Sequence, residues 1–273
     1  MIVFLLLFLA QDPPPPLGKL VDVGGHRVHL HCTGEGIPTV MVVGGYSMDW
    51  ALVQQDVARF TRICTYDVAG TAWSDPGPST TCDERVTELH ALISKSPVVL
   101  VGFSVGGLVV RHYAVRYPDE VKGVVFVDHA FTPPRPSPPK DLDNAPVLIF
   151  QTPIEFTVED TSDFKTNLPA RAQKLHEWAA ARKPPVDQAK TADSCLAELK
   201  HDALGSRPLV VVSTGNQAPG YKELQTRLLG LSSNSQQMLA ERSFHSIEID
   251  QPGVVVSAIR RVVEEVRTKP SVP

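Results

Sequence analysis

Short apolar runs alternate with amphipathic segments through the first half of the chain. Five runs rich in β-branched residues predict strands, and they span 26–32, 39–45, 61–67, 97–104 and 123–130. Helical periodicity follows three of them, at 50–60, 83–94 and 108–118. Because strands that alternate with helices form a mostly parallel sheet covered on both faces, the pattern predicts an α/β fold.

The alternation stops after Phe131 and resumes with a strand-like run at 208–215. The intervening segment, 132–207, is richer in Pro, Asp and Lys and contains helix-like pieces at 168–183 and 193–204. An insertion at the end of a sheet strand lies over the mouth of the sheet, so we interpret 132–207 as a helical lid. A simple surface excursion is the alternative. The predicted core is then 17–131 together with 208–273.

Composition narrows the class further. A chain of 273 residues with 42% hydrophobic residues is long enough for one large α/β domain. Its net charge of −4, without a long Lys/Arg run, offers nothing to attract phosphate backbones, so we predict no nucleic-acid partner.

Residues 1–16 differ from the rest of the chain. About nine apolar residues precede a polar, proline-rich break, which is too short for a stable membrane span and typical of a signal-peptide core near Ala10. We therefore predict export to the periplasm or the medium, with Pro13 to Pro16 as a stiff spacer. The basic residues of a normal leader are missing, however, and a misassigned start or a membrane-peripheral tail would leave the protein in the cytoplasm.

Ser104 stands between a predicted strand and a predicted helix. Gly102-Phe103-Ser104-Val105-Gly106 fits G-x-S-x-G in the context where that pattern exposes a serine nucleophile on a tight turn. The residues two before and two after such a serine come so close that only a small side chain fits, and Gly102 and Gly106 meet that demand. A glycine-rich turn with an incidental serine is the alternative.

A serine hydroxyl is a weak nucleophile, so this hypothesis requires a histidine base. His245 lies late in the chain, after a strand-like piece and before a helix, which fits the order Ser, acid, His. His29 and His31 share a strand face, but no carboxylate or cysteine completes a metal set, and we predict no metal site. His112 and His129 are more typical of packing or hydrogen-bonding histidines.

The acid of the triad is less obvious. The loop after 208–215 contains no aspartate near the usual position, only Asn216. Asp128 ends the preceding strand, and neighbouring strand ends can reach the same imidazole, so we choose Asp128. Glu223 and Asp202 are weaker rivals, and a loop-capping role for Asp128 is the alternative.

The oxyanion of an acyl-transfer reaction also needs donors. In the arrangement that G-x-S-x-G implies, one donor is the backbone N–H after the nucleophile, here Val105. The other comes from a loop after an earlier strand, where Gly44 and Gly45 permit close approach and the N–H of Tyr46 is the expected donor.

These residues together resemble the α/β-hydrolase superfamily, and more narrowly its bacterial esterase-like members. The matching stretches are "GGYSMDW", "CTYDVAGTAWSDPGP", "VGFSVGGLVVRHYAVRYPDEVKGVVFVD" and "FHSIEIDQP", and the resemblance runs from about residue 20 to 267. It is specific for the fold and weakly specific for the substrate. Ser104 argues against the members that use an aspartate nucleophile, the epoxide hydrolases and dehalogenases.

The chain departs from the family pattern in two loops. The stretch 67–75 lacks the usual arginine and one glycine, and Gly44-Gly45 replaces the familiar His-Gly. Both changes affect the expected pocket, for which Tyr46, Trp73 and Phe103 are candidate lining residues, although an aromatic near a turn more often packs.

The four cysteines contain no CxxC pair. The resemblance implies that the strand of Cys32 runs antiparallel beside that of Cys64, which makes a disulfide between them possible. Cys82 and Cys195 would pair only if the lid lies back over the loop after "SDPGP". Four buried free thiols are the alternative.

The leading hypothesis is a serine hydrolase that cleaves a small carboxylic ester through Ser104, Asp128 and His245, without a metal or organic cofactor. An aminopeptidase or amidase would want an acidic anchor in the lid, where four carboxylates are available: Glu155, Glu159, Asp160 and Asp163. A non-catalytic ligand-binding member of the fold is a third possibility, which an Asp128 turned away from His245 would favour. Substrate identity and oligomeric state do not follow from the sequence.

Overall fold

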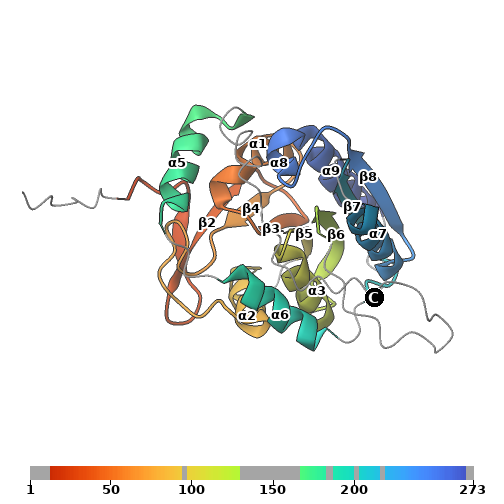
Figure 1. Ribbon diagram of the computed structural model, residues 1–273, viewed down its shortest axis with the longest axis horizontal. Helices are drawn as coiled ribbons and strands as arrows, with labels where there is room; N and C mark the ends of the chain where they lie inside the picture. The colour runs from red at the N-terminus through yellow and green to blue at the C-terminus, as the bar shows by residue number, and fades with distance from the viewer. Residues whose placement is uncertain are drawn as a thin grey trace, which may run out of the picture.

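An eight-stranded sheet forms the centre of the protein (Figure 1). The computed structural model describes residues 13–93, 97–129, 167–182, 187–199, 203–215 and 219–268. The strands are β1 (Lys19–Asp22), β2 (Arg27–Thr33), β3 (Thr39–Val43), β4 (Ile63–Tyr66), β5 (Val98–Phe103), β6 (Val121–Val127), β7 (Leu209–Thr214) and β8 (Ser235–Ala240). Their order is β1-β2-β4-β3-β5-β6-β7-β8; β2 runs antiparallel to both neighbours, and every other pair is parallel. The predicted α/β class is therefore confirmed.

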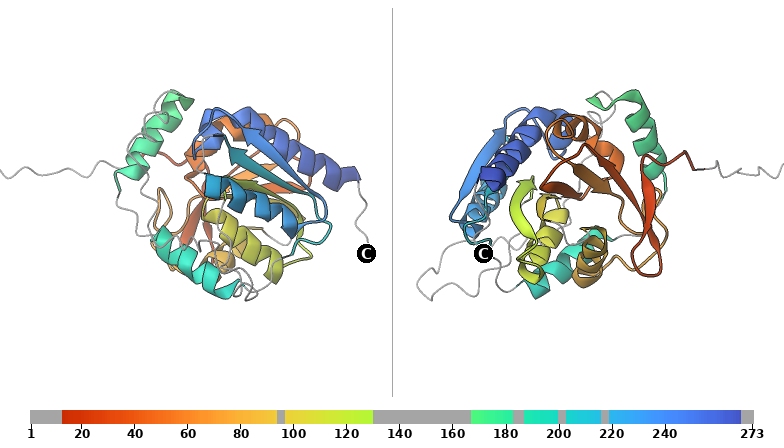
Figure 2. Two further views of the ribbon diagram at one scale, coloured as in Figure 1. Left: turned by 45° about the vertical axis from the view of Figure 1, so that its right-hand side comes forward. Right: turned by 180° about the vertical axis from the view of Figure 1, so that it is seen from behind.

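Helices cover both faces of the sheet (Figures 1 and 2). They are η1 (Ser47–Trp50), α1 (Ala51–Val57), α2 (Cys82–Ile93), α3 (Gly106–Arg116), α5 (Ala170–Ala180), α6 (Gln188–Glu198), α7 (Pro219–Arg227), η3 (Leu228–Leu231), α8 (Ile247–Asp250) and α9 (Pro252–Thr268). Buried side chains of α2, α3 and α6 share one apolar cluster with the sheet, and those of α1 and α9 share another.

The central strands are apolar along their whole length because both of their faces are buried. In β5, Val98 and Leu100 belong to the cluster under α2 and α3, while Val99 and Val101 face α1 and α9. Successive side chains of a strand point to opposite faces, so a continuous valine-rich run satisfies both layers at once. The carboxyl end of β5, which Ser104 follows, is therefore packed on both faces.

The two described helices of the insertion lie in different environments. Helix α5 packs against η1, and Leu168, Ala172 and Leu175 join Met48 in a third apolar cluster. Helix α6 instead packs against α2 and α3 and so extends a helical layer of the core. Helix α5 lies within the predicted piece 168–183, whereas α6 overlaps the predicted piece 193–204 only in part, because it begins at Gln188 and ends at Glu198. The division at 132–207 and its role as a lid stay predictions, because 130–166, 183–186 and 200–202 lie outside the described residues.

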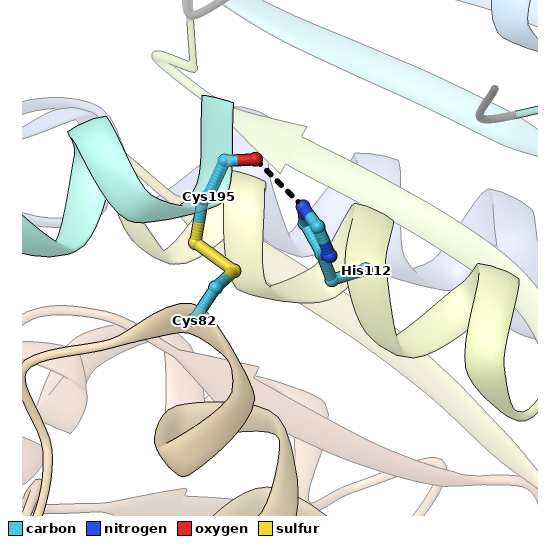
Figure 3. A group of neighbouring side chains, drawn as sticks. All are labelled: Cys82, His112 and Cys195. Carbon is cyan, nitrogen blue, oxygen red and sulfur yellow. Dashed lines mark hydrogen bonds between the residues drawn. A yellow bond between two sulfur atoms is a disulfide. The ribbon is translucent and has the colours of Figure 1, made fainter. Parts of the chain in front are cut away.

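Two disulfides tie distant parts of the chain. Cys32 and Cys64 are directly opposite each other on the antiparallel strands β2 and β4, as the resemblance implied. Cys82, at the start of α2, bonds to Cys195 of α6, and the Nε2 of His112 on α3 is 2.8 Å from the carbonyl oxygen of Cys195 (Figure 3). One disulfide and one hydrogen bond thus link the three helices α2, α3 and α6.

Some elements were not anticipated from the sequence. These are β1, the polar helix α7 and the single turn α8, which lies between His245 and α9. Among the described helices, none combines the length and the apolar character needed to cross a membrane. Residues 1–12, which carry the predicted leader, lie outside the described part of the chain.

Candidate active site

Ser104 occupies a sharp turn between β5 and α3. Its φ is 51°, in the left-handed region that a residue with a side chain adopts only under constraint. A Cβ on Gly106 would lie 2.0 Å from the carbonyl oxygen of Val43, and one on Gly102 would lie 2.7 Å from the Cα of Gly107. Only glycine fits at either position, which is the steric requirement inferred from G-x-S-x-G.

Asp128 and His245 are in direct contact. The Nδ1 of His245 lies 2.5 Å from Oδ2 of Asp128, whose side chain is 3% exposed against 21% for the histidine. Asp128 follows β6, and its N–H donates to the carbonyl of Val212 on β7 at 2.9 Å. This backbone bond fixes the acid at the carboxyl edge of the sheet.

Helix α7 supplies the remaining support for Asp128. The amide Nε2 of the fully buried Gln225 donates to Oδ1 of Asp128 at 2.6 Å, and the hydroxyl of Tyr221 donates to its carbonyl oxygen at 3.3 Å. The sequence did not predict either residue, since α7 is mostly polar and carries no motif. With His245 on one oxygen and Gln225 on the other, the carboxylate is held in a single orientation.

Of the rival residues, the structure describes only Glu223. Glu223 is exposed and forms an ion pair with Arg227 at 2.8 Å. Asn216 and Asp202 lie outside the described residues. Of the two rivals and Asp128 that the sequence raised, Asp128 is the described residue in contact with His245.

The histidine also lies beside the nucleophile turn. The rings of His245 and Phe103 are 4.8 Å apart, centroid to centroid, and Phe103 immediately precedes Ser104. The three predicted triad residues thus converge at the carboxyl ends of β5 and β6, which lie next to each other in the sheet.

His29, one of the histidines that the sequence raised, has structural partners on both ring nitrogens. His29 is fully buried: its Nδ1 lies 2.7 Å from Oδ2 of Asp67, and its Nε2 accepts the N–H of Gly18 at 2.9 Å. Since Nε2 accepts, the proton is on Nδ1 and is donated to Asp67. His29 therefore links Gly18, just before β1, to Asp67 in the loop after β4.

The two predicted oxyanion donors differ in whether their N–H groups already donate a hydrogen bond. Among the described residues nothing accepts a hydrogen bond from the N–H of Val105. The N–H of Tyr46, in contrast, donates to Oδ2 of Asp49 at 3.1 Å, and Oδ1 of Asp49 lies 2.7 Å from Nδ1 of His176 on α5. Asp49 is three residues into the η1 turn and reaches back to its start, as in a capping box. Tyr46 can bind an oxyanion only if Asp49 releases it.

The candidate pocket aromatics are engaged mainly with protein. Phe103 is 8% exposed and lies edge-on to Trp50 and beside His245. Trp73 packs between His29 and Trp178, and its Nε1–H donates to the carbonyl of Pro14 at 2.7 Å. These contacts favour packing roles for Phe103 and Trp73.

Comparison with known proteins identifies the family. Residues 35–190, more than half of the chain, match the family described as "alpha/beta hydrolase fold".

The chain belongs to the α/β hydrolase fold family.

Named relatives of this α/β hydrolase include esterases. It is 26% identical over 259 residues to the uncharacterized protein YqjL of Bacillus subtilis, covering 88% of this chain and 90% of that one. It is 34% identical over 106 residues to the pimeloyl-[acyl-carrier protein] methyl ester esterase of Chromobacterium violaceum, which covers 37% and 40% of the two chains. A thermophilic esterase from Thermogutta terrifontis superposes with a TM-score of 0.66 at 23% identity, covering 89% and 95%, and shares the fold.

A buried acid lies one turn after the candidate base of this α/β hydrolase. Glu248 is 1% exposed, and its Oε2 has no hydrogen-bond partner among the residues that the structure describes. Burial, together with the negative charges of Asp49, Asp250 and Asp128, raises the pKa of Glu248 well above its ordinary value of 4.5. Burial among these carboxylates therefore favours the protonated, neutral form of Glu248.

Replacing Glu248 should make the protein more stable at high pH. Above pH 4.5 the unfolded chain releases the Glu248 proton whereas the folded protein keeps it, so stability falls as pH rises. Glu248→Gln stays neutral, and we expect a higher free energy of unfolding than wild type at pH 8, with a gain that shrinks towards pH 4.5. Urea unfolding across this range measures it.

Glu264→Gln is the matched control, because Glu264 is exposed on α9. It should leave the pH dependence of stability as in wild type. A Glu248→Gln effect that is the same at every pH would contradict a protonated Glu248.

Proposed function

We propose that this α/β hydrolase is a serine hydrolase that cleaves small carboxylic esters through an acyl-enzyme intermediate. The observation that carries the proposal is the short contact between Asp128 and His245 beside a serine held in left-handed conformation. A nucleophile, a base and an acid that orients the base are the parts that such chemistry needs.

The proposed reaction begins with proton transfer from Ser104 to His245 as the serine oxygen attacks the ester carbonyl. Asp128 accepts the Nδ1–H of His245, which sets the tautomer and stabilises the imidazolium. The proton then passes to the departing alcohol, and an acyl group remains on Ser104. Water activated by His245 releases the acid and restores the serine. These steps use side chains and backbone of the chain and no cofactor.

The oxyanion of each tetrahedral intermediate would bind the N–H of Val105, which no acceptor in the described part of the chain engages. The N–H of Tyr46 would be the second donor once its bond to Asp49 opens. A buried carboxylate at that position competes with an oxyanion for the same N–H, so loop η1 has to adjust when substrate binds.

The competing functions have less support. The carboxylates that an aminopeptidase would use as anchors, Glu155, Glu159, Asp160 and Asp163, lie outside the described residues. A non-catalytic role would be favoured by an Asp128 turned away from His245, whereas the two are hydrogen-bonded. The relative named as a methyl ester esterase supports an ester substrate over an amide.

Ser104→Ala should abolish hydrolysis of short-chain p-nitrophenyl esters, with kcat reduced by at least about 10³-fold because the nucleophile is lost. Wild type should also be labelled covalently by a fluorophosphonate, and the variant should not. Ser257→Ala is the control: Ser257 is exposed on α9 and bonds only within that helix, so its activity should match wild type. A folded wild-type protein without labelling at Ser104 would defeat the proposal.

We also propose export from the cytoplasm, because two closed disulfides suit an oxidising compartment and residues 1–16 resemble a leader. Mass spectrometry of protein from its native cells should find the first ten or so residues removed and all four cysteines resistant to alkylation. Intact Met1 together with four reactive thiols would contradict export.

A further inference from the structure

His129 contacts the backbone of the candidate nucleophile. It is fully buried, and its Nδ1 lies 2.9 Å from the carbonyl oxygen of Ser104. A carbonyl oxygen only accepts, so the imidazole proton is on Nδ1 and is donated to Ser104. The triad chemistry proposed above does not use this histidine.

Residues at the end of β6 and just after it form hydrogen bonds with both backbone polar groups of Ser104. The N–H of Ser104 donates to the carbonyl of Val127 at 3.2 Å, and its carbonyl accepts from His129 and from Gly107 N–H at 3.1 Å. Between Val127 and His129 stands Asp128, with a left-handed φ of 43° and its side chain on His245. Val127 and His129 therefore form hydrogen bonds with the backbone of Ser104. Asp128, which lies between them, forms one with the side chain of His245.

The carbonyl that His129 holds belongs to the peptide group between Ser104 and Val105. The other polar atom of that rigid, planar unit is the Val105 N–H, the proposed oxyanion donor. A donor on the carbonyl fixes the direction in which this N–H points. It also polarises the peptide, which strengthens the N–H as a donor.

The surroundings keep His129 in this one role. A Cβ on Gly107 would lie 2.3 Å from the imidazole Cγ, so glycine at 107 makes room for the ring. Burial and, secondarily, the positive charge of Arg111 lower the pKa of His129 to about 3. The ring of His129 is consequently neutral well above pH 3, and it stays a hydrogen-bond donor to Ser104.

We propose that His129 is a positioning residue that orients and polarises the Ser104–Val105 peptide for oxyanion binding. The inference rests on the proposed serine-hydrolase function and assigns this dipeptide, Asp128-His129, to two tasks. Asp128 orients the base, and His129 orients the oxyanion donor. His129 thereby affects the rate of the chemical step and not the ground-state binding of the ester.

Two substitutions separate the hydrogen bond from packing. His129→Leu fills the buried site with an apolar side chain but removes the donor. His129→Asn is smaller and leaves a cavity, yet its Nδ2 can donate near the position of the histidine Nδ1. If His129 only packs, the leucine variant should be both more stable and faster than the asparagine variant. If the hydrogen-bond donor matters, the leucine variant should still be more stable, but the asparagine variant should have the higher kcat.

The assay measures kcat, KM and melting temperature with p-nitrophenyl acetate, and the rate of fluorophosphonate labelling, for wild type and both variants. We expect His129→Leu to lower kcat about 10- to 100-fold with KM within about twofold, as small misplacements at reacting centres do. His129→Asn should recover most of the loss, and labelling rates should follow kcat. Wild-type kcat in His129→Leu, or no recovery in His129→Asn, would overturn the inference.

A crystal structure of His129→Leu separates this inference from the ester function. We expect the Ser104–Val105 peptide to rotate away from its wild-type orientation, whatever the substrate is. If wild type cleaves no ester and is not labelled, the proposed function fails, and this structure still decides the role of His129. A peptide that keeps its orientation without the donor would overturn it.

Discussion

The hydrogen bond between Asp128 and His245 is the interaction on which the rest of the site depends. It joins residues 117 positions apart in the sequence, and it forms because β6 ends beside β5 and β7. Asp128 leaves its strand with a left-handed backbone, which turns its carboxylate towards the loop after β8. Such a conformation costs free energy and persists only where surrounding contacts hold it. Here those contacts are the backbone bond to Val212 and the side chains of α7.

The nucleophile turn and the acid turn are two parts of one structure. Ser104 and Asp128 both have positive φ, and the residues flanking Asp128 bond the N–H and the carbonyl of Ser104. Strain at one turn is therefore supported by hydrogen bonds from the other. The parallel pairing of β5 and β6 buries valines, and it also brings the proposed nucleophile, the proposed acid and the predicted oxyanion donor to the carboxyl end of the sheet.

Sequence reasoning went furthest where backbone geometry restricts residue type. The glycines around Ser104 are needed by close contacts within one turn, so G-x-S-x-G in a strand-to-helix context predicted that turn. The absence of an aspartate after β7 pointed to Asp128. Gln225 and Tyr221 could not be found in this way, since a polar helix has many residues that look alike until packing selects two. The hydrogen bond from Tyr46 N–H to Asp49 has the spacing of a capping box. The sequence did not reveal it, because a tyrosine stands where such a box usually begins with Ser or Thr. The disulfide between Cys82 and Cys195 depended on where α6 docks, which local patterns do not encode.

The most direct test of this account is the ester-hydrolysis rate of Asp128→Asn, compared with Glu223→Gln. Asparagine at 128 keeps the size of the side chain but loses the charge that orients and stabilises protonated His245. The account predicts a kcat about 10²- to 10⁴-fold below wild type for a folded Asp128→Asn protein, and wild-type kcat for Glu223→Gln. Wild-type kcat in Asp128→Asn would contradict it, because the acid of the triad would then have to lie elsewhere.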